Sequence, residues 1–358
     1  MIAEVALLAL SLGLASIFVV NLGFSSEGRP PAFRRPSYLT LRAARTESPP
    51  SIDGRAEALW RRAAPLRVKT FAIKKFGNRR IMEVELRALY TQEEIFFLAR
   101  WKDDTQSLHY KPWVFDGKKW HEERDLADDA FAFNWNISSR LFPLIGCRAA
   151  CHLSSYPDHQ GLTPHDMWTA KPGELLDQWE WRATETAPLG WMKDAVVAHL
   201  DFAAFVQKNP GAKPRGRLLD KVRASPDLFK FNADFYTDDR PMYVPNPKKG
   251  GDIHAPYLHV TGPDSLVPIK GITFKKGDRV GGIVLPPEVP PPVRGDLVVK
   301  GRYAEGGWTL EIKRKLRTND SDDVQFDPAK REGYYFGVAV FDHSVYHNFS
   351  DVLRLVFE

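Results

Sequence analysis

Cysteine is nearly absent from this sequence: only two occur among its 358 residues, at positions 147 and 151. So small a number excludes the disulfide-rich scaffold of many small secreted proteins. The sequence also lacks a Ser-His-Asp order, a glycine-rich phosphate loop and an H-E-x-x-H motif, so nothing in it predicts hydrolysis or nucleotide chemistry. The net charge of +5 is too small and too scattered to predict binding to nucleic acid.

Lysine and arginine are missing from the first 28 residues, and this stretch contains a long apolar run at residues 5–24. A helix of about 20 apolar residues spans a bilayer. A cleaved secretory signal is the alternative, but such signals normally begin with a basic residue and have a shorter apolar segment. We therefore expect residues 1–24 to form one transmembrane helix.

The remainder of the chain predicts a short linker and one large, mainly β domain. Residues 25–48 are rich in Pro, Arg and Ser and have no apolar periodicity, as in a linker. The domain is expected at residues 49–358. Alternating or dense apolar runs predict strands at residues 81–90, 94–101, 130–137, 178–184, 296–303, 308–316, 334–342 and 352–357. In 308–316, Trp308, Leu310 and Ile312 alternate with polar residues, which predicts one buried and one wet face.

The pattern changes between about 190 and 294. Residues 191–207 have the spacing of a helix, and proline and glycine then recur, with five prolines among residues 286–292. We expect an insertion of loops and a helix within a β-sandwich.

Both cysteines belong to the segment Gly-Cys-Arg-Ala-Ala-Cys-His at residues 146–152. In the C-x-x-C-H signal for covalent haem attachment, two thiols bind the haem vinyl groups and the histidine binds the iron. This segment is one residue longer between the cysteines, which a bulge can absorb. We expect one c-type haem, attached through Cys147 and Cys151, with His152 as the proximal iron ligand.

Two other interpretations of these residues stay open. Cys147 and Cys151 can form a local disulfide in an exported protein. They can also bind zinc together with His152 and either His159 or His165, although the spacing matches no familiar zinc motif.

The sixth iron ligand is expected to be a histidine or a methionine. His347, in the turn that follows the strand at 334–342, is the first candidate, and Met167 is the second. The remaining candidates are His165, His199 and Met192.

Alternation at residues 178–182 predicts that Trp179 and Trp181 share one face of a strand while Arg182 lies on the other. As cofactor-binding residues, the two indoles would wall the haem and Arg182 would meet a propionate. The competing interpretation is that both tryptophans belong to the core.

Four segments in this order resemble the haem-binding domain of the ethylbenzene dehydrogenase type, the gamma-subunit type of molybdenum enzymes related to dimethyl sulfoxide reductase. They are Ser-Ile-Asp-Gly-Arg-Ala-Glu-Ala-Leu-Trp at 51–60, the cysteine segment, Gly-Glu-Leu-Leu-Asp-Gln-Trp-Glu-Trp-Arg at 173–182, and Phe-Gly-Val-Ala-Val-Phe-Asp at 336–342. The resemblance implies an immunoglobulin-like β-sandwich of the kind also seen in carbohydrate-binding modules. In that family soluble members hold b-type haem through a Met and a Lys, and His347 stands near the position of the Lys. The cysteines and the anchor depart from the family.

These expectations combine into a membrane-anchored monohaem cytochrome c that transfers single electrons and is not itself an enzyme. Its partners would be other subunits of a respiratory or photosynthetic membrane complex, a molybdenum oxidoreductase or a soluble redox protein. The haem domain would lie on the periplasmic side, although basic flanks favour the cytoplasmic side, because large domains cross membranes despite such flanks. The flanking residues are Arg29, Arg34, Arg35, Arg42 and Arg45. The alternative is an exported β-sandwich that binds carbohydrate or another ligand.

Overall fold

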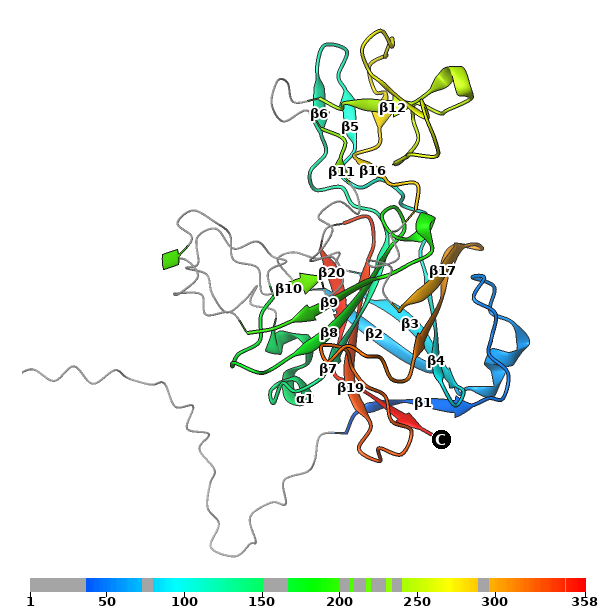
Figure 1. Ribbon diagram of the computed structural model, residues 1–358, viewed down its shortest axis with the longest axis vertical. Helices are drawn as coiled ribbons and strands as arrows, with labels where there is room; N and C mark the ends of the chain where they lie inside the picture. Colours follow the sequence, from blue (N-terminus) through cyan, green and yellow to red (C-terminus); the bar gives the residue numbers. More distant parts are fainter. Residues whose placement is uncertain are drawn as a thin grey trace, which may run out of the picture. The chain divides into compact units, whose positions relative to one another are not determined.

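The folded part of the chain consists largely of β-strands, which confirms the predicted mainly β class. The computed structural model describes residues 37–72, 80–150, 167–199, 207–208, 217–219, 230–233, 240–288, 296–344 and 346–358. Its main sheet has thirteen strands, of which eleven run in the order β10-β9-β8-β7-β19-β20-β2-β3-β4-β18-β17 (Figure 1). The remaining two, β1 and β21, pair with each other, and β1 also pairs with β3 while β21 pairs with β19.

The thirteen strands of this sheet are β1 (Leu39–Arg45), β2 (Leu66–Ala72), β3 (Met82–Tyr90), β4 (Glu94–Lys102), β7 (Ala130–Asn136), β8 (Leu176–Arg182), β9 (Lys193–Val197), β10 (Arg217–Leu219), β17 (Val298–Tyr303), β18 (Gly307–Lys315), β19 (Tyr334–Phe341), β20 (His347–Ser350) and β21 (Leu353–Phe357). The eight expected strands correspond to β3, β4, β7, β8, β17, β18, β19 and β21.

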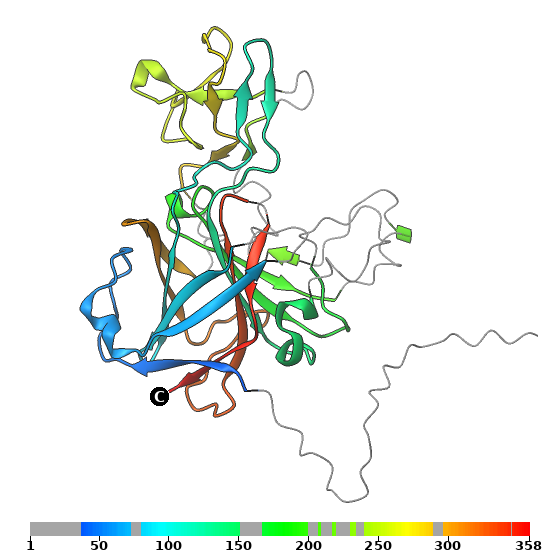
Figure 2. The same ribbon diagram turned by 180° about the vertical axis from the view of Figure 1, so that it is seen from behind.

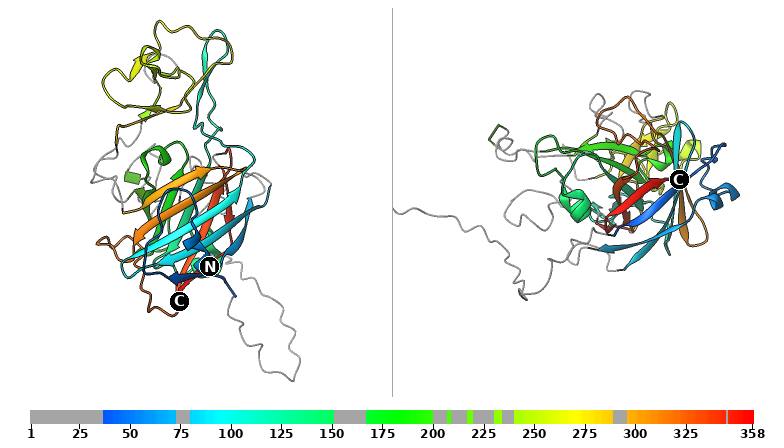
Figure 3. Two further views of the ribbon diagram at one scale, coloured as in Figure 1. Left: turned by 90° about the vertical axis from the view of Figure 1, so that its right-hand side faces the viewer. Right: turned by 90° about the horizontal axis from the view of Figure 1, so that it is seen from below.

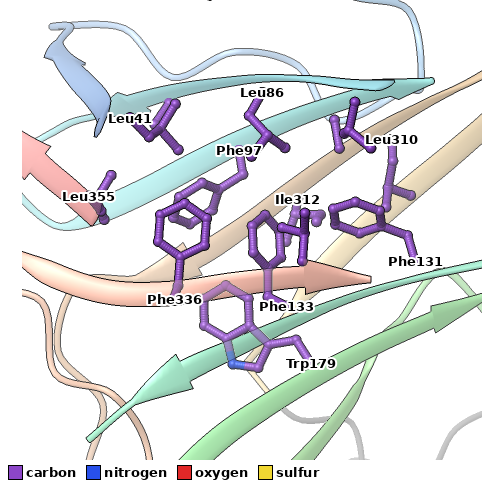
Figure 4. Packing of buried hydrophobic residues seen from close by; sticks show 14 of the residues in the cluster. Leu41, Leu86, Phe97, Phe131, Phe133, Trp179, Leu310, Ile312, Phe336 and Leu355 are labelled. Atoms are coloured by element: carbon purple, nitrogen blue, oxygen red, sulfur yellow. The ribbon is translucent and has the colours of Figure 1, made fainter. Parts of the chain in front are cut away.

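The sheet folds over on itself, so that two of its parts pack face to face as in a sandwich. The strands β2, β3, β4, β18 and β17 run side by side in one layer (Figure 3, left). Phe97 of β4 packs against Phe133 of β7 and Trp179 of β8, with ring centroids 5.3 and 5.9 Å apart. Figure 4 shows these rings interleaved with Leu310 and Phe336. This aromatic layer is the core, and it accounts for the dense apolar runs of the sequence.

The predicted linker is wrong at its C-terminal part. Strand β1 lies within it and runs parallel to β21, with Leu41 opposite Leu355 (Figure 2). Leu41 and Ala43 are fully buried, so this strand belongs to the core even though its neighbours are mostly Arg and Pro.

The predicted helix at 191–207 is also wrong where the chain is described. Lys193–Val197 forms β9, which pairs antiparallel with β8 and carries the β-branched Val196 and Val197 at its end. A short apolar run of this kind fits a strand or a helix equally well by spacing alone, and here pairing with β8 decides.

The face of β18 that was expected to be wet is buried at one position, Glu311. Glu311 is covered by the 51–60 segment, which includes the start of the 3-10 helix η1 (Ala58–Arg62). Its carboxylate accepts hydrogen bonds from the backbone of Asp53 and Gly54 and from the indole of Trp60, at 3.0, 2.8 and 2.8 Å. On the other face of the strand, in line with Leu310 and Ile312, Arg314 is buried against Asp177 and Asp323. Buried charges of this kind need partners, and both have them.

The region predicted as an insertion contains short strands in three small sheets. These strands are β11 (Lys230–Phe231), β12 (Tyr243–Pro245), β13 (Leu258–His259), β14 (Leu266–Pro268), β15 (Arg279–Val280) and β16 (Ile283–Leu285), with the 3-10 helix η4 (Pro247–Lys249) between β12 and β13. β15 also pairs with the hairpin of β5 (Trp113–Phe115) and β6 (Trp120–Glu122), which lies outside the insertion. Among the described residues of the insertion, only 207–208 have α-helical conformation. The described part of the insertion therefore does not contain the predicted helix.

The predicted anchor at residues 1–24 lies outside the described residues. Within the described part of the chain, no helix has the length and apolar character needed to cross a membrane.

Candidate functional site

A cavity of about 430 Å³ lies on the face of β7, β8 and β19 that is turned away from the aromatic core, and β20 continues its wall. Large side chains of β7 and β19 fill the core side, whereas the cavity side carries small residues. Ala132 and Ala339 stand opposite each other across these two strands, and Gly337 is next along. Because alanine and glycine have little or no side chain, these three positions leave space for the cavity.

A short helical segment places Cys147 in the wall of this cavity. After β7 the chain forms α1 (Phe142–Ile145), with Phe142 fully buried, and then the 3-10 helix η2 (Gly146–Ala149). Gly146 joins the two helices with a φ of 62°, a left-handed conformation that favours glycine. Cys147 follows directly and lines the cavity.

The other members of the predicted haem motif, Cys151 and His152, lie outside the described residues. The described chain stops at Ala150 and resumes at Met167, and the Trp168 amide donates a hydrogen bond of 3.0 Å to the Ala150 carbonyl. The two ends of the intervening segment are therefore held together, with Cys147 and Met167 both in the cavity wall.

The two leading candidates for the sixth ligand both line this cavity. Met167 accepts a hydrogen bond at Sδ from the Gln178 amide, at 3.4 Å. The His347 ring packs on Phe341, with centroids 4.9 Å apart. Met167 and His347 are 180 residues apart in the sequence, on either side of the insertion, so this proximity is a product of the fold.

The remaining candidates are not brought together with them. Met192 is buried in the aromatic core, and His199 is tied by Nδ1 to the Thr169 carbonyl at 3.0 Å; neither lines the cavity. His165, like His159 of the zinc alternative, lies outside the described residues.

Strand β8 divides its side chains between the core and the cavity. Trp179 and Trp181 are fully buried in the core, where Trp181 packs edge-on to Trp308. The structure thus favours the core interpretation of both tryptophans over a haem wall. Gln178, Glu180 and Arg182 line the cavity instead, so the predicted alternation is confirmed and Arg182 lies on the cavity side.

A buried ionic network closes one end of the cavity. Arg182 donates from Nε and Nη2 to Asp128, at 3.0 and 2.6 Å. Lys193 forms ion pairs with Glu180 and Glu185. The carboxylates therefore occupy the Arg182 guanidinium, which argues against the predicted bond from Arg182 to a propionate.

The carboxylates of this network keep the Arg182 guanidinium charged. Burial alone would lower the pKa of Arg182, but the carboxylates of Asp128, Glu180 and Glu185 together raise it. The neighbouring Tyr110, whose ring lies 4.7 Å from the Arg182 guanidinium, has its pKa raised to about 12 by burial. This end of the cavity is therefore lined by groups of fixed charge and by the neutral phenol of Tyr110.

The family model of ethylbenzene dehydrogenase matches residues 57–352, which contain every described residue of the cavity. The chain belongs to the ethylbenzene dehydrogenase family. The match confirms the resemblance inferred from the sequence, and it extends across the insertion. The candidate site of this family member is therefore the cavity, all of whose described residues lie within the match.

Comparison with curated proteins gives no match. Among solved structures, a candidate carbohydrate-binding protein from Bacteroides uniformis is similar, with a TM-score of 0.36, 10% identity, and coverage of 90% of this chain and 100% of the other. A family 9 carbohydrate-binding module from Caldicellulosiruptor kristjanssonii in complex with glucose has a TM-score of 0.31 and 8% identity, covering 88% and 96%. Its complex with cellotriose has a TM-score of 0.31 and 8% identity, covering 89% and 94%.

Several cavity residues were not anticipated. Gln178, Ala132 and Ala339 were assigned no role from the sequence. The available signal was the alternation of small and large residues in Ala-Phe-Ala-Phe at 130–133 and Gly-Val-Ala-Val-Phe at 337–341. Two neighbouring strands with small residues on the same face predict a hollow beside a well-packed layer.

Proposed function

We propose that this chain is the haem-carrying, electron-transfer subunit of a redox complex, with one covalent c-type haem in the cavity beside β7, β8, β19 and β20. In this proposal Cys147 and Cys151 form the thioether bonds and His152 is the proximal iron ligand. Met167 or His347 supplies the sixth ligand. The haem, when bound, supplies one-electron redox chemistry, and the chain performs no bond chemistry of its own.

The observation that carries the proposal is the position of Cys147 in the wall of the same cavity as Met167 and His347. A thiol, a thioether and an imidazole are the donor types that c-type haem needs. Membership of the ethylbenzene dehydrogenase family independently supports an electron-transfer-related subunit.

The residues around the cavity suit a large flat apolar group with charged edges. Ala132, Ala339, Phe341 and Phe349 supply apolar surface, and such surface excludes water from a macrocycle. Lys111 also lines the cavity, and it has no ion pair among the described residues. We therefore assign to Lys111, in place of Arg182, the role of meeting a propionate.

The same proposal places the chain at the membrane. Residues 1–24 would anchor it, and the domain would face the periplasm, where covalent haem attachment takes place. The acceptors or donors would be subunits of a respiratory or photosynthetic membrane complex, a molybdenum oxidoreductase or a soluble redox protein.

Haem staining of a denaturing gel, combined with a pyridine haemochrome spectrum of the full-length protein, tests the proposal. We expect a stained band at the mass of the chain and one haem per polypeptide. Cys147→Ser should leave a single thioether and shift the haemochrome band, and Cys147→Ser with Cys151→Ser should abolish the stain. An unstained wild-type chain, with its two cysteines oxidised or holding zinc, would instead support the exported binding module.

A further inference from the structure

The side chain of Gln178 makes an unusual contact in the cavity. It is 8% exposed, and among the described residues its only side-chain hydrogen bond is the one from Nε2 to Met167 Sδ, at 3.4 Å. The amide oxygen Oε1 is buried and has no hydrogen-bond partner in the described part of the chain. A buried amide normally uses both its donor and its acceptor, so this one is committed to a single thioether.

The thioether of Met167 needs such a contact if its orientation is to be fixed. Methionine has three rotatable side-chain bonds, and its sulfur is a weak acceptor that settles in many positions. The apolar residues packed around Met167, which include Phe142, Ala149, Ala150 and Leu176, make no polar contact with Sδ. The Gln178 amide therefore supplies the directional interaction that selects one orientation.

We propose that Met167 is the sixth iron ligand and that Gln178 is its positioning residue. This inference rests on the haem function proposed above and deepens it. A thioether sulfur has two lone pairs, so that one can bind iron while the other accepts the Gln178 N–H. Hydrogen bonds of this kind, one step removed from the metal, orient a ligand and adjust its donor strength.

The contact has a definite effect on the reduction potential. A hydrogen bond to sulfur withdraws electron density from it, which weakens its donation to iron. Ferric iron depends more on that donation than ferrous iron does, so the Gln178 bond favours the reduced state and raises the potential. Methionine ligation already raises the potential relative to a second histidine, and Gln178 acts in the same direction.

The chain offers a matched control in Asn134. This amide stands directly opposite Gln178 in the pairing of β7 and β8, is 7% exposed and lines the same cavity. Its Oδ1 also lacks a hydrogen-bond partner among the residues that the structure describes, but the Asn134 side chain makes no hydrogen bond to Met167 there. Asn134→Leu and Gln178→Leu therefore remove equivalent amides from one cavity wall, and only the second removes the contact with sulfur.

The experiment uses the full-length haem-loaded protein in mild detergent. We measure the midpoint potential by redox titration and the sulfur-to-iron charge-transfer band of the ferric protein. Gln178→Leu should lower the potential and weaken that band clearly more than Asn134→Leu does, because only Gln178 contacts the sulfur. Gln178→Glu should resemble wild type at acidic pH, where its carboxyl can donate, and resemble Gln178→Leu once it is ionised.

Each outcome separates the positioning role from the proposed function. A haem-loaded wild type without the charge-transfer band, whose spectrum responds to His347→Ala, would overturn the inference and leave the haem function intact. Equal effects of the Gln178 and Asn134 variants would reduce Gln178 to a packing residue and also overturn it. A chain without covalent haem would fail the staining test first, and that result would reject the function itself.

Discussion

At the scale of single residues, burial of acidic groups gives the domain a distinctive pH dependence. Asp103, Asp129 and Asp342 bring carboxylate oxygens within 4.8 Å of one another. Burial, together with the charge of Asp129, raises the pKa of Asp103 to about 7, and burial raises that of Asp129 to about 6. A carboxyl group whose pKa is higher in the folded state binds its proton more tightly there, so its contribution to stability is present at low pH.

Asp103→Asn should therefore change how stability varies with pH. In wild type, the contribution of Asp103 is full below about pH 4 and is lost as the pH rises through about 7. The amide cannot ionise, and it can keep the acceptor role toward the Thr105 amide. We expect the melting temperature of the variant, relative to wild type, to rise between pH 4 and pH 8. A constant difference across thermal melts in that range would contradict the assignment.

The sequence predicted single residues unevenly. Cys147, Met167 and His347 were selected for their chemistry, and they share one cavity because β19, β20 and the α1–η2 segment meet there. For Trp179 and Trp181 the sequence left a haem wall and the core both open, because alternation reveals which residues share a face but not which face meets the core. Glu311 was expected in water for the same reason: only the tertiary structure brings Gly54 and Trp60 over it.

At the scale of elements, the strands with strong alternation or dense apolar runs could be predicted and the others could not. β1 was missed because its sequence, Leu-Thr-Leu-Arg-Ala-Ala-Arg, is short and follows a proline-rich stretch, and pairing with β21 and β3 stabilises it. β9 was assigned to a helix because its apolar residues fit both periods. In both cases long-range pairing outweighs local preference.

The small residues of β7 and β19 lead to a prediction about the cavity. Ala339→Leu should fill the hollow, since Ala339 faces Ala132 across the two strands and lines the cavity. The added side chain would project away from the aromatic core, so we expect the domain to fold while haem incorporation, measured as absorbance per polypeptide, falls at least several-fold.

The control is Val340→Leu, whose side chain lies on the other face, 1% exposed within the core. Overpacking there costs about 1–3 kcal/mol of stability, but haem incorporation per folded chain should stay near wild type. Equal haem loading in Ala339→Leu and wild type would mean that the haem does not occupy this cavity.

At the scale of the whole molecule, the N-terminal segment and the folded domain have separable roles in our proposal. Every described residue of the cavity lies between positions 110 and 350, and the family match begins at residue 57. Binding of haem should therefore depend on residues 1–36 only through export, because covalent attachment requires delivery to the periplasm. In our proposal the long apolar run without a basic start favours a retained anchor over a cleaved signal.

Replacing residues 1–36 with a cleavable secretory signal separates these two roles. We expect the exchanged protein to be recovered from the periplasm in soluble form, with the same haem stain and the same ferric spectrum as wild type. Wild type itself should remain in the membrane pellet after alkaline extraction and keep its N-terminal residues in the intact mass. A wild-type chain that is soluble and shortened after residue 24 would identify the segment as a signal. Loss of haem in the exchanged protein, despite its export, would show that residues 1–36 contribute to the haem site, contrary to the separation proposed here.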